Sequence, residues 1–300
     1  MTTKEVSILG LGDMGSAIAR VLLQNGWKTT VWNRTASKAT LLVEKGAIAA
    51  KSAKECLAAS PVVVCCLLTP AVVLDVLGHV DSVASSGRTL VDYTAGSKDE
   101  TQQCANAAAG LGIRGYIRGA IATTPRYLGE ADTRLFYSGA SQDVFDAAQP
   151  HLEPLGRSVY LGNDVSSASL LESAIASSFF CFASGIVQSM AMAQKCNLWG
   201  NEGAQKLVKE AIAPLCRTVY PAFAAELAHQ VDSGTFTGNG DGLRLDTVQS
   251  ALNSLTKTTE KQGVSPMMLL PLKELVEKGV GEGAAAQELS SLVQTICNMR

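Results

Sequence analysis

Three glycines near the start of the chain have the spacing of a phosphate-binding turn. They follow an apolar run at 6–9 and precede a helical pattern at 17–23. The first glycine permits a tight turn, the second lets the backbone approach a pyrophosphate, and the third lets helix and strand pack closely. The N-terminus of the helix adds unpaired N–H groups and a partial positive charge. The spacing predicts a dinucleotide-binding loop, with cofactor contacts from Gly10, Leu11, Gly12, Asp13, Met14 and Gly15.

The segment after the second predicted strand indicates which dinucleotide to expect. Asn33, Arg34 and Thr35 follow this strand, and Lys38 lies one turn later. NAD-binding loops carry an acidic residue here, which accepts hydrogen bonds from the ribose hydroxyls. A guanidinium instead pairs with a 2′-phosphate through two parallel hydrogen bonds. We therefore expect NADP(H); the alternative is that Arg34 is a solvated surface charge.

The first half of the chain alternates predicted strands with predicted helices. Such alternation produces a parallel sheet covered on both faces, which binds ligands at the carboxyl ends of its strands. Strands are predicted at 6–9, 29–32, 61–68, 89–92, 115–120 and 135–138, and helices at 36–45, 53–59, 71–76, 99–109 and 142–152, several of them after the caps Ser52, Ser97 and Ser141. The strand ends add Cys66, Leu67, Leu68, Thr94 and Ala95 to the expected cofactor contacts.

The second half of the chain has only helical patterns. A helix is predicted at 167–197, followed by helices at 202–213, 218–231, 244–262, 267–278 and 283–299. The predicted fold class is an α/β Rossmann N-terminal domain plus an all-α C-terminal domain, joined by a long interdomain helix. The predicted division is a cofactor domain at 1–163, the interdomain helix at 164–197, and a helical dimerisation and substrate domain at 198–300.

Composition limits the possible partners of this 300-residue chain. Hydrophobic residues make up 47% and charged residues 17%, which indicates a large core. A net charge of −2 gives no electrostatic basis for binding nucleic acid or anionic membranes. Eight cysteines without a CxxC pair or a Cys/His cluster predict reduced thiols in the cytoplasm and no metal site. A predicted strand follows the first five residues directly, so no secretory signal is expected.

The long predicted helix carries no charge between Glu172 and Lys195. Its serines and glutamines make it too polar for a lipid-facing span, so we expect it to be buried between protein surfaces. A monomer cannot cover such a helix on every side, and exchange of helices within a homodimer would cover it.

Several segments of the chain together resemble one family. They are GLGDMGSAIA at 10–19, VWNRT at 31–35, YTAGS at 93–97, LFYSG at 135–139, LGNDVSSASL at 161–170 and SPMMLLPLKELVEKGVGEG at 265–283. The chain resembles the NADPH-dependent imine reductases, and most of all the fungal reductive aminases, of the β-hydroxyacid dehydrogenase superfamily. The resemblance implies a 6-phosphogluconate dehydrogenase-like helical domain swapped between two subunits. It also implies an active site between one subunit's Rossmann domain and the partner's helices.

The same resemblance indicates the active-site positions. Glu172 matches the position that carries a lysine in β-hydroxyacid dehydrogenases and an aspartate or tyrosine in imine reductases. Phe180 stands where similar reductive aminases have a tyrosine, Ala95 where they have an asparagine, and Cys216 near an expected tryptophan. The predicted catalytic residue is Glu172, and the predicted substrate pocket comprises Thr124, Tyr127, Phe180, Cys216, Tyr220 and Asn239.

Two roles for Glu172 stay open at this point. Its carboxylate can stabilise an iminium cation or, with a pKa raised by burial, donate a proton. Alternatively it only stabilises the first turns of its helix or pairs with a surface lysine. The expected function is reduction of a C=N bond of an apolar or cyclic small molecule, with natural-product biosynthesis as the expected setting. The alternatives are reduction of a ketone, aldehyde or other polarised bond, and NADP binding without redox turnover.

Overall fold

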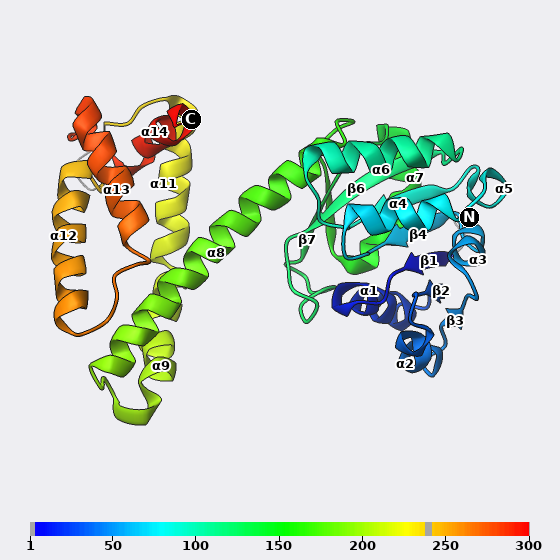
Figure 1. The fold of residues 1–300 in the computed structure, drawn as a ribbon, viewed down its shortest axis with the longest axis horizontal. Helices are drawn as coiled ribbons and strands as arrows, with labels where there is room; N and C mark the ends of the chain where they lie inside the picture. The colour runs from blue at the N-terminus through cyan, green and yellow to red at the C-terminus, as the bar shows by residue number, and fades with distance from the viewer. Residues whose placement is uncertain (1–3, 238–241, 300) are drawn as a thin grey trace. The chain divides into compact units, whose positions relative to one another are not determined.

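The structure is a computed structural model that describes residues 4–237 and 242–299. The chain divides into two compact units, Met1–Ser178 and Phe179–Arg300. The boundary lies inside one long helix, α8 (Ser166–Lys195), which contributes residues to both units (Figure 1). The predicted division at 163 and 197 stays a prediction.

The first unit is built on one eight-stranded sheet with the order β3-β2-β1-β4-β5-β6-β7-β8 (Figure 1). The strands are β1 (Glu5–Leu9), β2 (Lys28–Trp32), β3 (Ile48–Ala49), β4 (Val62–Cys65), β5 (Thr89–Asp92), β6 (Gly115–Ile121), β7 (Arg134–Ser138) and β8 (Arg157–Tyr160). The Rossmann fold class is confirmed. The short strands β3 and β8 were not predicted.

The expectation of a wholly parallel sheet is wrong at one pair of strands. β6 and β7 pair antiparallel, whereas every other neighbouring pair in the sheet is parallel. A parallel connection needs a crossover, usually a helix, between the strands. The connection from 122 to 133 contains no helix, so the chain turns back directly beside β6.

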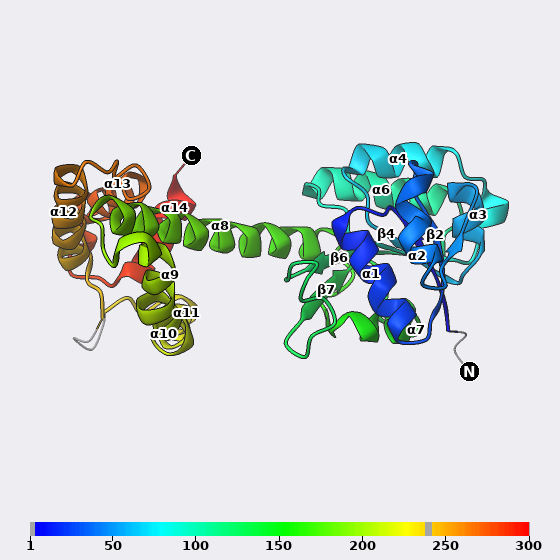
Figure 2. The same ribbon diagram turned by 90° about the horizontal axis from the view of Figure 1, so that it is seen from below.

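Helices cover both faces of this sheet, as the strand–helix alternation predicts. Val62 and Val64 of β4 point into one hydrophobic core, and Val63 and Cys65 point into the other, because side chains alternate along a strand. The first core packs α1 (Asp13–Gln24), α2 (Thr40–Val43) and α7 (Gln142–Leu152); the second packs α3 (Ala53–Ala58), α4 (Pro70–Gly78), α5 (Ser82–Ser85) and α6 (Lys98–Gly110). Figure 2 shows α4 and α6 on one side of the sheet and α1 on the other.

Side-chain caps fix the starts of several of these helices. Ser52 accepts a hydrogen bond from the Glu55 N–H at the start of α3. Ser97 and Glu100 form a reciprocal capping box at the start of α6. Ser141 precedes α7 as predicted, but its side chain makes no capping bond there.

The start of α8 is tied to the sheet. The Asp164 carboxylate accepts hydrogen bonds from the N–H and hydroxyl of Ser166, at 2.9 and 2.7 Å. The Ser138 hydroxyl at the end of β7 accepts from the Ala168 N–H at 3.0 Å. These contacts set where the first two turns of α8 lie against the carboxyl end of β7 and beside β6.

The second unit is helical, as predicted. Leu245, Leu252, Val276 and Leu292 form its buried core. The helices are α9 (Gly203–Lys206), α10 (Ala213–Arg217), α11 (Val219–Ser233), α12 (Leu245–Lys261), α13 (Leu270–Gly279) and α14 (Leu292–Asn298), and a π-helical segment, Leu207–Ile212, joins α9 to α10. The single helix predicted at 283–299 is wrong, because Glu288 pairs with Arg244 in an isolated β-bridge and a 3₁₀ turn, Leu289–Ser291, precedes α14.

Helix α8 is apolar, and this chain leaves several of its apolar side chains exposed. Its length and hydropathy are sufficient for a membrane span, and none of its most apolar stretch is buried within this single chain. The expectation that protein covers this helix is therefore not met by the chain alone. Phe180, Phe182 and Val187 are among its exposed apolar side chains.

Candidate active site

The glycine loop has the close contacts that its spacing predicts. Gly10 has a φ of +99°, and a Cβ on it would lie 2.3 Å from the carbonyl oxygen of Cys66. A Cβ on Gly15 would lie 2.1 Å from the Gly10 carbonyl oxygen. A Cβ on Gly12 would meet nothing within 4 Å. Two of the glycines therefore allow the protein to pack, whereas Gly12 faces open space that a pyrophosphate can approach.

The N-terminus of α1 is free to bind an anion. Gly12 is its N-cap residue, and no side chain among the described residues caps it. Asn33 holds the neighbouring loops together: its Oδ1 accepts from the Leu11 N–H at 3.0 Å, and its Nδ2 donates to the Thr35 carbonyl at 3.1 Å. The first N–H groups of α1 therefore remain available to phosphate oxygens.

The basic residues predicted to select NADP lie at the rim of this loop. Arg34, Thr35 and Lys38 are all exposed after β2. A cavity of about 640 Å³ brings predicted cofactor residues Asp13 and Lys38 together with predicted substrate residue Thr124. Its other lining residues are Ser16, Arg20, Leu41, Leu42, Lys45, Pro125 and Arg126. The uncapped helix and the exposed cations fit a dinucleotide that carries a 2′-phosphate.

The carboxyl ends of β4 and β5 are joined by hydrogen bonds. The Thr94 hydroxyl accepts from the Leu67 N–H at 3.1 Å, and the Thr94 N–H donates to Asp92 Oδ1 at 2.8 Å. Cys66 packs beside Gly15, and burial raises the pKa of its thiol to about 11. Leu68 and Ala95 are exposed at the same edge.

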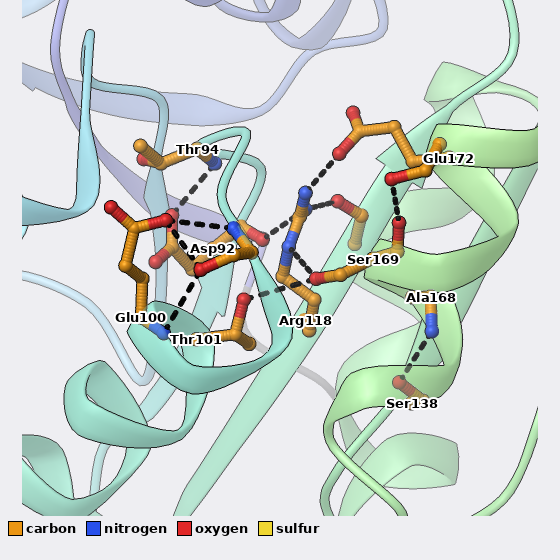
Figure 3. Close-up of polar contacts among 12 residues, drawn as sticks. Asp92, Thr94, Glu100, Thr101, Arg118, Ser138, Ala168, Ser169 and Glu172 are labelled. Atoms are coloured by element: carbon orange, nitrogen blue, oxygen red, sulfur yellow. Dashed lines mark hydrogen bonds and ion pairs between the residues drawn. The ribbon is translucent and has the colours of Figure 1, made fainter. Parts of the chain in front are cut away.

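A buried arginine connects this edge to Glu172. Arg118 lies in β6, is wholly buried, and donates through Nη1 to the main-chain oxygens of Asp92, at 3.0 Å, and Gly119. Its Nε donates to the Ser169 hydroxyl of α8 at 3.0 Å, and its Nη2 donates to Glu172 Oε2. Figure 3 shows Arg118 between Asp92 on one side and Ser169 and Glu172 on the other.

The structure changes how Glu172 is interpreted. It is the seventh residue of α8, beyond the first turn, and its partner is the buried Arg118 rather than a surface lysine. Burial raises the pKa of the Glu172 carboxyl, and the Arg118 charge opposes that rise. The side chain is 29% exposed, so the carboxylate lies between a buried cation and solvent.

Sequence reasoning missed the buried partners of Glu172. Arg118 stands within an apolar strand, GYIRGAI, and a charge inside a buried strand is the signal that identifies it. Asp92 ends β5, where its Oδ2 accepts from the Tyr116 hydroxyl at 2.7 Å. Neither residue belongs to the glycine loop or to the resemblance that indicates Glu172.

The predicted substrate residues fall in different units. Thr124 and Tyr127 lie in the loop after β6 and are exposed, and the Arg126 guanidinium lies 5.6 Å from the Tyr127 ring centre. Phe180, Cys216 and Tyr220 belong to the second unit, in α8, α10 and α11. There Tyr220 contacts the ring of Phe182 edge to face. Asn239 lies outside the described residues. The substrate assignments of all six stay predictions.

Comparison with known proteins gives a consistent result along the whole chain. Residues 5–162 match the NAD binding domain of 6-phosphogluconate dehydrogenase. Residues 164–298 match the C-terminal domain of NADPH-dependent reductive aminase-like proteins.

Individual relatives agree with these family matches. An NADPH-dependent reductive aminase from Aspergillus oryzae is 34% identical over 97% of both chains. A reductive aminase from Aspergillus terreus, solved with NADPH4, cyclohexanone and allyl amine, has a TM-score of 0.89 at 33% identity, covering 99% of this chain and 100% of that one. An imine reductase from Aspergillus terreus, solved with NADPH4 and a dibenzazepine, has a TM-score of 0.83 at 33% identity, covering 98% and 100%.

These matches confirm the predicted fold class, the oxidoreductase class and NADP(H) as the cofactor. The glycine loop and the basic segment after β2 lie in the first matched region, and all of α8 lies in the second. The chain therefore belongs to the family of NADPH-dependent reductive aminases and imine reductases.

Proposed function

We propose that this protein reduces the C=N bond of an imine or iminium ion with NADPH, and that Glu172 stabilises the positive charge of the substrate. The supporting observation is the carboxylate of Glu172, linked through Arg118 to Asp92 and so to Thr94 at the cofactor-binding edge. Membership of the reductive aminase family supports the same reaction.

The residues for holding the cofactor are those of the glycine loop and of the rim after β2. The N–H groups at the start of α1 would hold the pyrophosphate, and Arg34, Thr35 and Lys38 would hold the 2′-phosphate. When bound, NADPH supplies the hydride. The remaining cofactor contacts would come from the ends of β4 and β5, at Cys66, Leu67, Thr94 and Ala95.

The charge around Glu172 suits a cationic substrate. Asp92 and Glu172 contribute two carboxylates against the one guanidinium of Arg118, so the cluster carries a formal charge of −1 when both are ionised. An iminium ion nearby compensates that charge. On hydride addition a C–H bond forms and the C=N π electron pair becomes the nitrogen lone pair. A protonated iminium therefore becomes a neutral amine without a further proton.

We also propose that a second copy of the chain covers the exposed apolar face of α8. Phe179, Phe180, Phe182 and Val187 leave apolar surface on this helix that water would otherwise contact. We expect a cytoplasmic homodimer in which Phe180, Cys216 and Tyr220 of the helical unit help to bind an apolar or cyclic substrate. The structures of relatives with cyclohexanone and with a dibenzazepine support that substrate class, and natural-product biosynthesis is the setting we propose.

A substrate panel tests the proposed reaction. Purified protein is mixed with NADPH and either a cyclic imine, a ketone alone, or the ketone with a primary amine. We expect NADPH oxidation with the imine and with the ketone–amine pair, and the amine product by mass spectrometry. Alcohol formation from the ketone alone at a higher rate would instead identify a carbonyl reductase. NADPH binding without oxidation in any arm would contradict redox function.

A further inference from the structure

Arg118 makes more directed contacts than packing of a strand requires. All three guanidinium nitrogens donate hydrogen bonds, to Ser169, to Glu172 and to two main-chain oxygens. A charge in a wholly buried position is costly unless it is paired and hydrogen-bonded. The planar fork of arginine meets these acceptors at fixed angles, which the single ammonium of a lysine cannot do.

Glu172 is the carboxylate that compensates this buried charge. Asp92 is the other nearby acid, but its Oδ1 accepts from the Thr94 N–H and its Oδ2 from the Tyr116 hydroxyl. Within the described part of the chain, Arg118 bonds to Asp92 through its main-chain oxygen and not through its carboxylate. The Glu172 carboxylate therefore has a fixed partner on its buried side and solvent on the other.

Ser169 connects the Arg118–Glu172 pair to helix α6. Its hydroxyl accepts from Arg118 Nε and lies 3.0 Å from the Thr101 hydroxyl of α6. Ser169 precedes Glu172 by three residues on α8, so the two side chains share one face of the helix. The guanidinium thus contacts two successive turns of α8. These two contacts fix the position of the Glu172 carboxylate relative to the sheet.

We propose that Arg118 is a positioning residue that holds Glu172 as a fixed, ionised carboxylate facing the reacting C=N bond. This inference rests on the proposed function, because it assigns Glu172 to that reaction. It makes Glu172 a stabiliser of positive charge, since the neighbouring guanidinium favours the ionised carboxylate over the protonated acid. The other groups that face the pair are Asp92 from β5, Cys66 after β4 and, toward Arg118, Tyr93 and Cys104.

Turnover of an N-methylated cyclic iminium tests this role, because that substrate carries its charge at every pH. Arg118→Met removes the guanidinium, and Arg118→Lys keeps a charge without the fork. We expect kcat to fall roughly a hundredfold in Arg118→Met and about tenfold in Arg118→Lys, with unchanged binding of NADPH by calorimetry. The acid limb of the kcat profile moves to higher pH in Arg118→Met, because nothing then opposes protonation of Glu172.

Two further variants separate positioning from general packing. Arg88→Met is the matched control: Arg88 is a half-buried arginine that donates to the Ala58 carbonyl at 2.9 Å, and its loss leaves the pH profile in place. The double variant Arg118→Met/Glu172→Gln should be no slower than Glu172→Gln alone. If Arg118→Met lowered kcat in the Glu172→Gln background as much as it does in the unmodified protein, the inference would be overturned. Arg118 would then act without Glu172.

A spectroscopic measurement keeps the inference separate from the proposed reaction. The carboxyl ¹³C resonance of Glu172, assigned by its loss in Glu172→Gln, is titrated in the unmodified protein and in Arg118→Met. We expect the apparent pKa to be higher in Arg118→Met, even if no C=N bond is reduced. Coincident titrations in the two proteins would overturn the inference, whereas absent turnover alone would overturn only the proposed function.

Discussion

The guanidinium of Arg118, wholly buried in β6, donates a hydrogen bond to the carboxylate of Glu172 on α8, 54 residues further along the chain. Through the Asp92 main chain the same guanidinium reaches the strand end that holds Thr94. The charged group predicted for catalysis and the edge predicted for the cofactor therefore belong to one hydrogen-bonded network.

Replacement of Glu172 by glutamine should slow turnover and leave cofactor binding intact. The amide keeps nearly the same shape but loses the negative charge that stabilises an iminium. We expect kcat to fall roughly a hundredfold, with an unchanged Kd for NADPH by calorimetry. A rate equal to that of the unmodified protein would reduce Glu172 to a structural role.

The pH dependence distinguishes the two chemical roles of Glu172. Burial raises the pKa of its carboxyl despite the opposing Arg118 charge, so it takes up a proton at higher pH than an ordinary glutamate. If the ionised form acts, kcat for an N-methylated iminium falls as the pH is lowered through this raised pKa. Reduction of this iminium needs no proton, so a proton donor would leave its kcat constant across the same range, and a constant kcat would contradict the charge-stabilising role.

Loss of the Glu172 side chain should also destabilise the protein. Glu172→Ala leaves Arg118 buried without its charge partner, which costs about 3 kcal/mol in the free energy of unfolding. Chemical denaturation measures this difference. Lys54→Ala is the control: the Lys54–Asp81 pair is exposed, and its loss should leave the unfolding midpoint nearly unchanged. Equal effects of the two substitutions would contradict the account of the buried pair.

Arg34→Ala tests the choice between the two dinucleotides. Arg34 is exposed beside the glycine loop and is expected to pair with the 2′-phosphate, which NADH lacks. The Kd for NADPH should rise by roughly tenfold to a hundredfold, while that for NADH changes little. Calorimetry with both cofactors measures this, and equal losses for the two would be inconsistent with a 2′-phosphate contact.

Two glycine substitutions should have opposite effects. Gly12→Ala places a methyl group in open space, so thermal stability is retained while NADPH binding weakens by roughly tenfold or more. Gly15→Ala places one 2.1 Å from the Gly10 carbonyl oxygen, which costs about 1–3 kcal/mol in the free energy of unfolding. Thermal unfolding and calorimetry on the two variants compare these effects. Unaltered cofactor binding in a folded Gly12→Ala protein would argue against a pyrophosphate at this turn.

Local signals account for the parts of the fold that could be predicted. The glycine spacing and the strand–helix alternation predict β1, α1, β2, α3, β4 and α4 within a few residues of their bounds. The reversal between β6 and β7 was missed although the sequence carries a signal for it: no helix is predicted between the strands at 115–120 and 135–138, and a parallel pair needs a crossover. The break before α14 could not be predicted, because the β-bridge between Arg244 and Glu288 is a tertiary contact that no local pattern shows.

The site was predictable only where its residues share a motif. Gly10 and Arg34 belong to recognisable local patterns, and Glu172 was found through a family resemblance. Arg118 and Asp92 meet Glu172 through tertiary structure alone, since β5, β6 and α8 are brought together by the sheet order. Arg118 and Glu172 are 54 residues apart, and no local sequence pattern relates residues at that separation.

Oxidation of NADPH with an N-methylated cyclic iminium, measured in the unmodified protein and in Glu172→Gln, tests whether Glu172 acts on the C=N bond. We expect stoichiometric formation of the tertiary amine by the unmodified protein and a roughly hundredfold lower rate in the variant. Tight binding of NADPH without any amine product, or equal rates in the two proteins, would contradict this expectation.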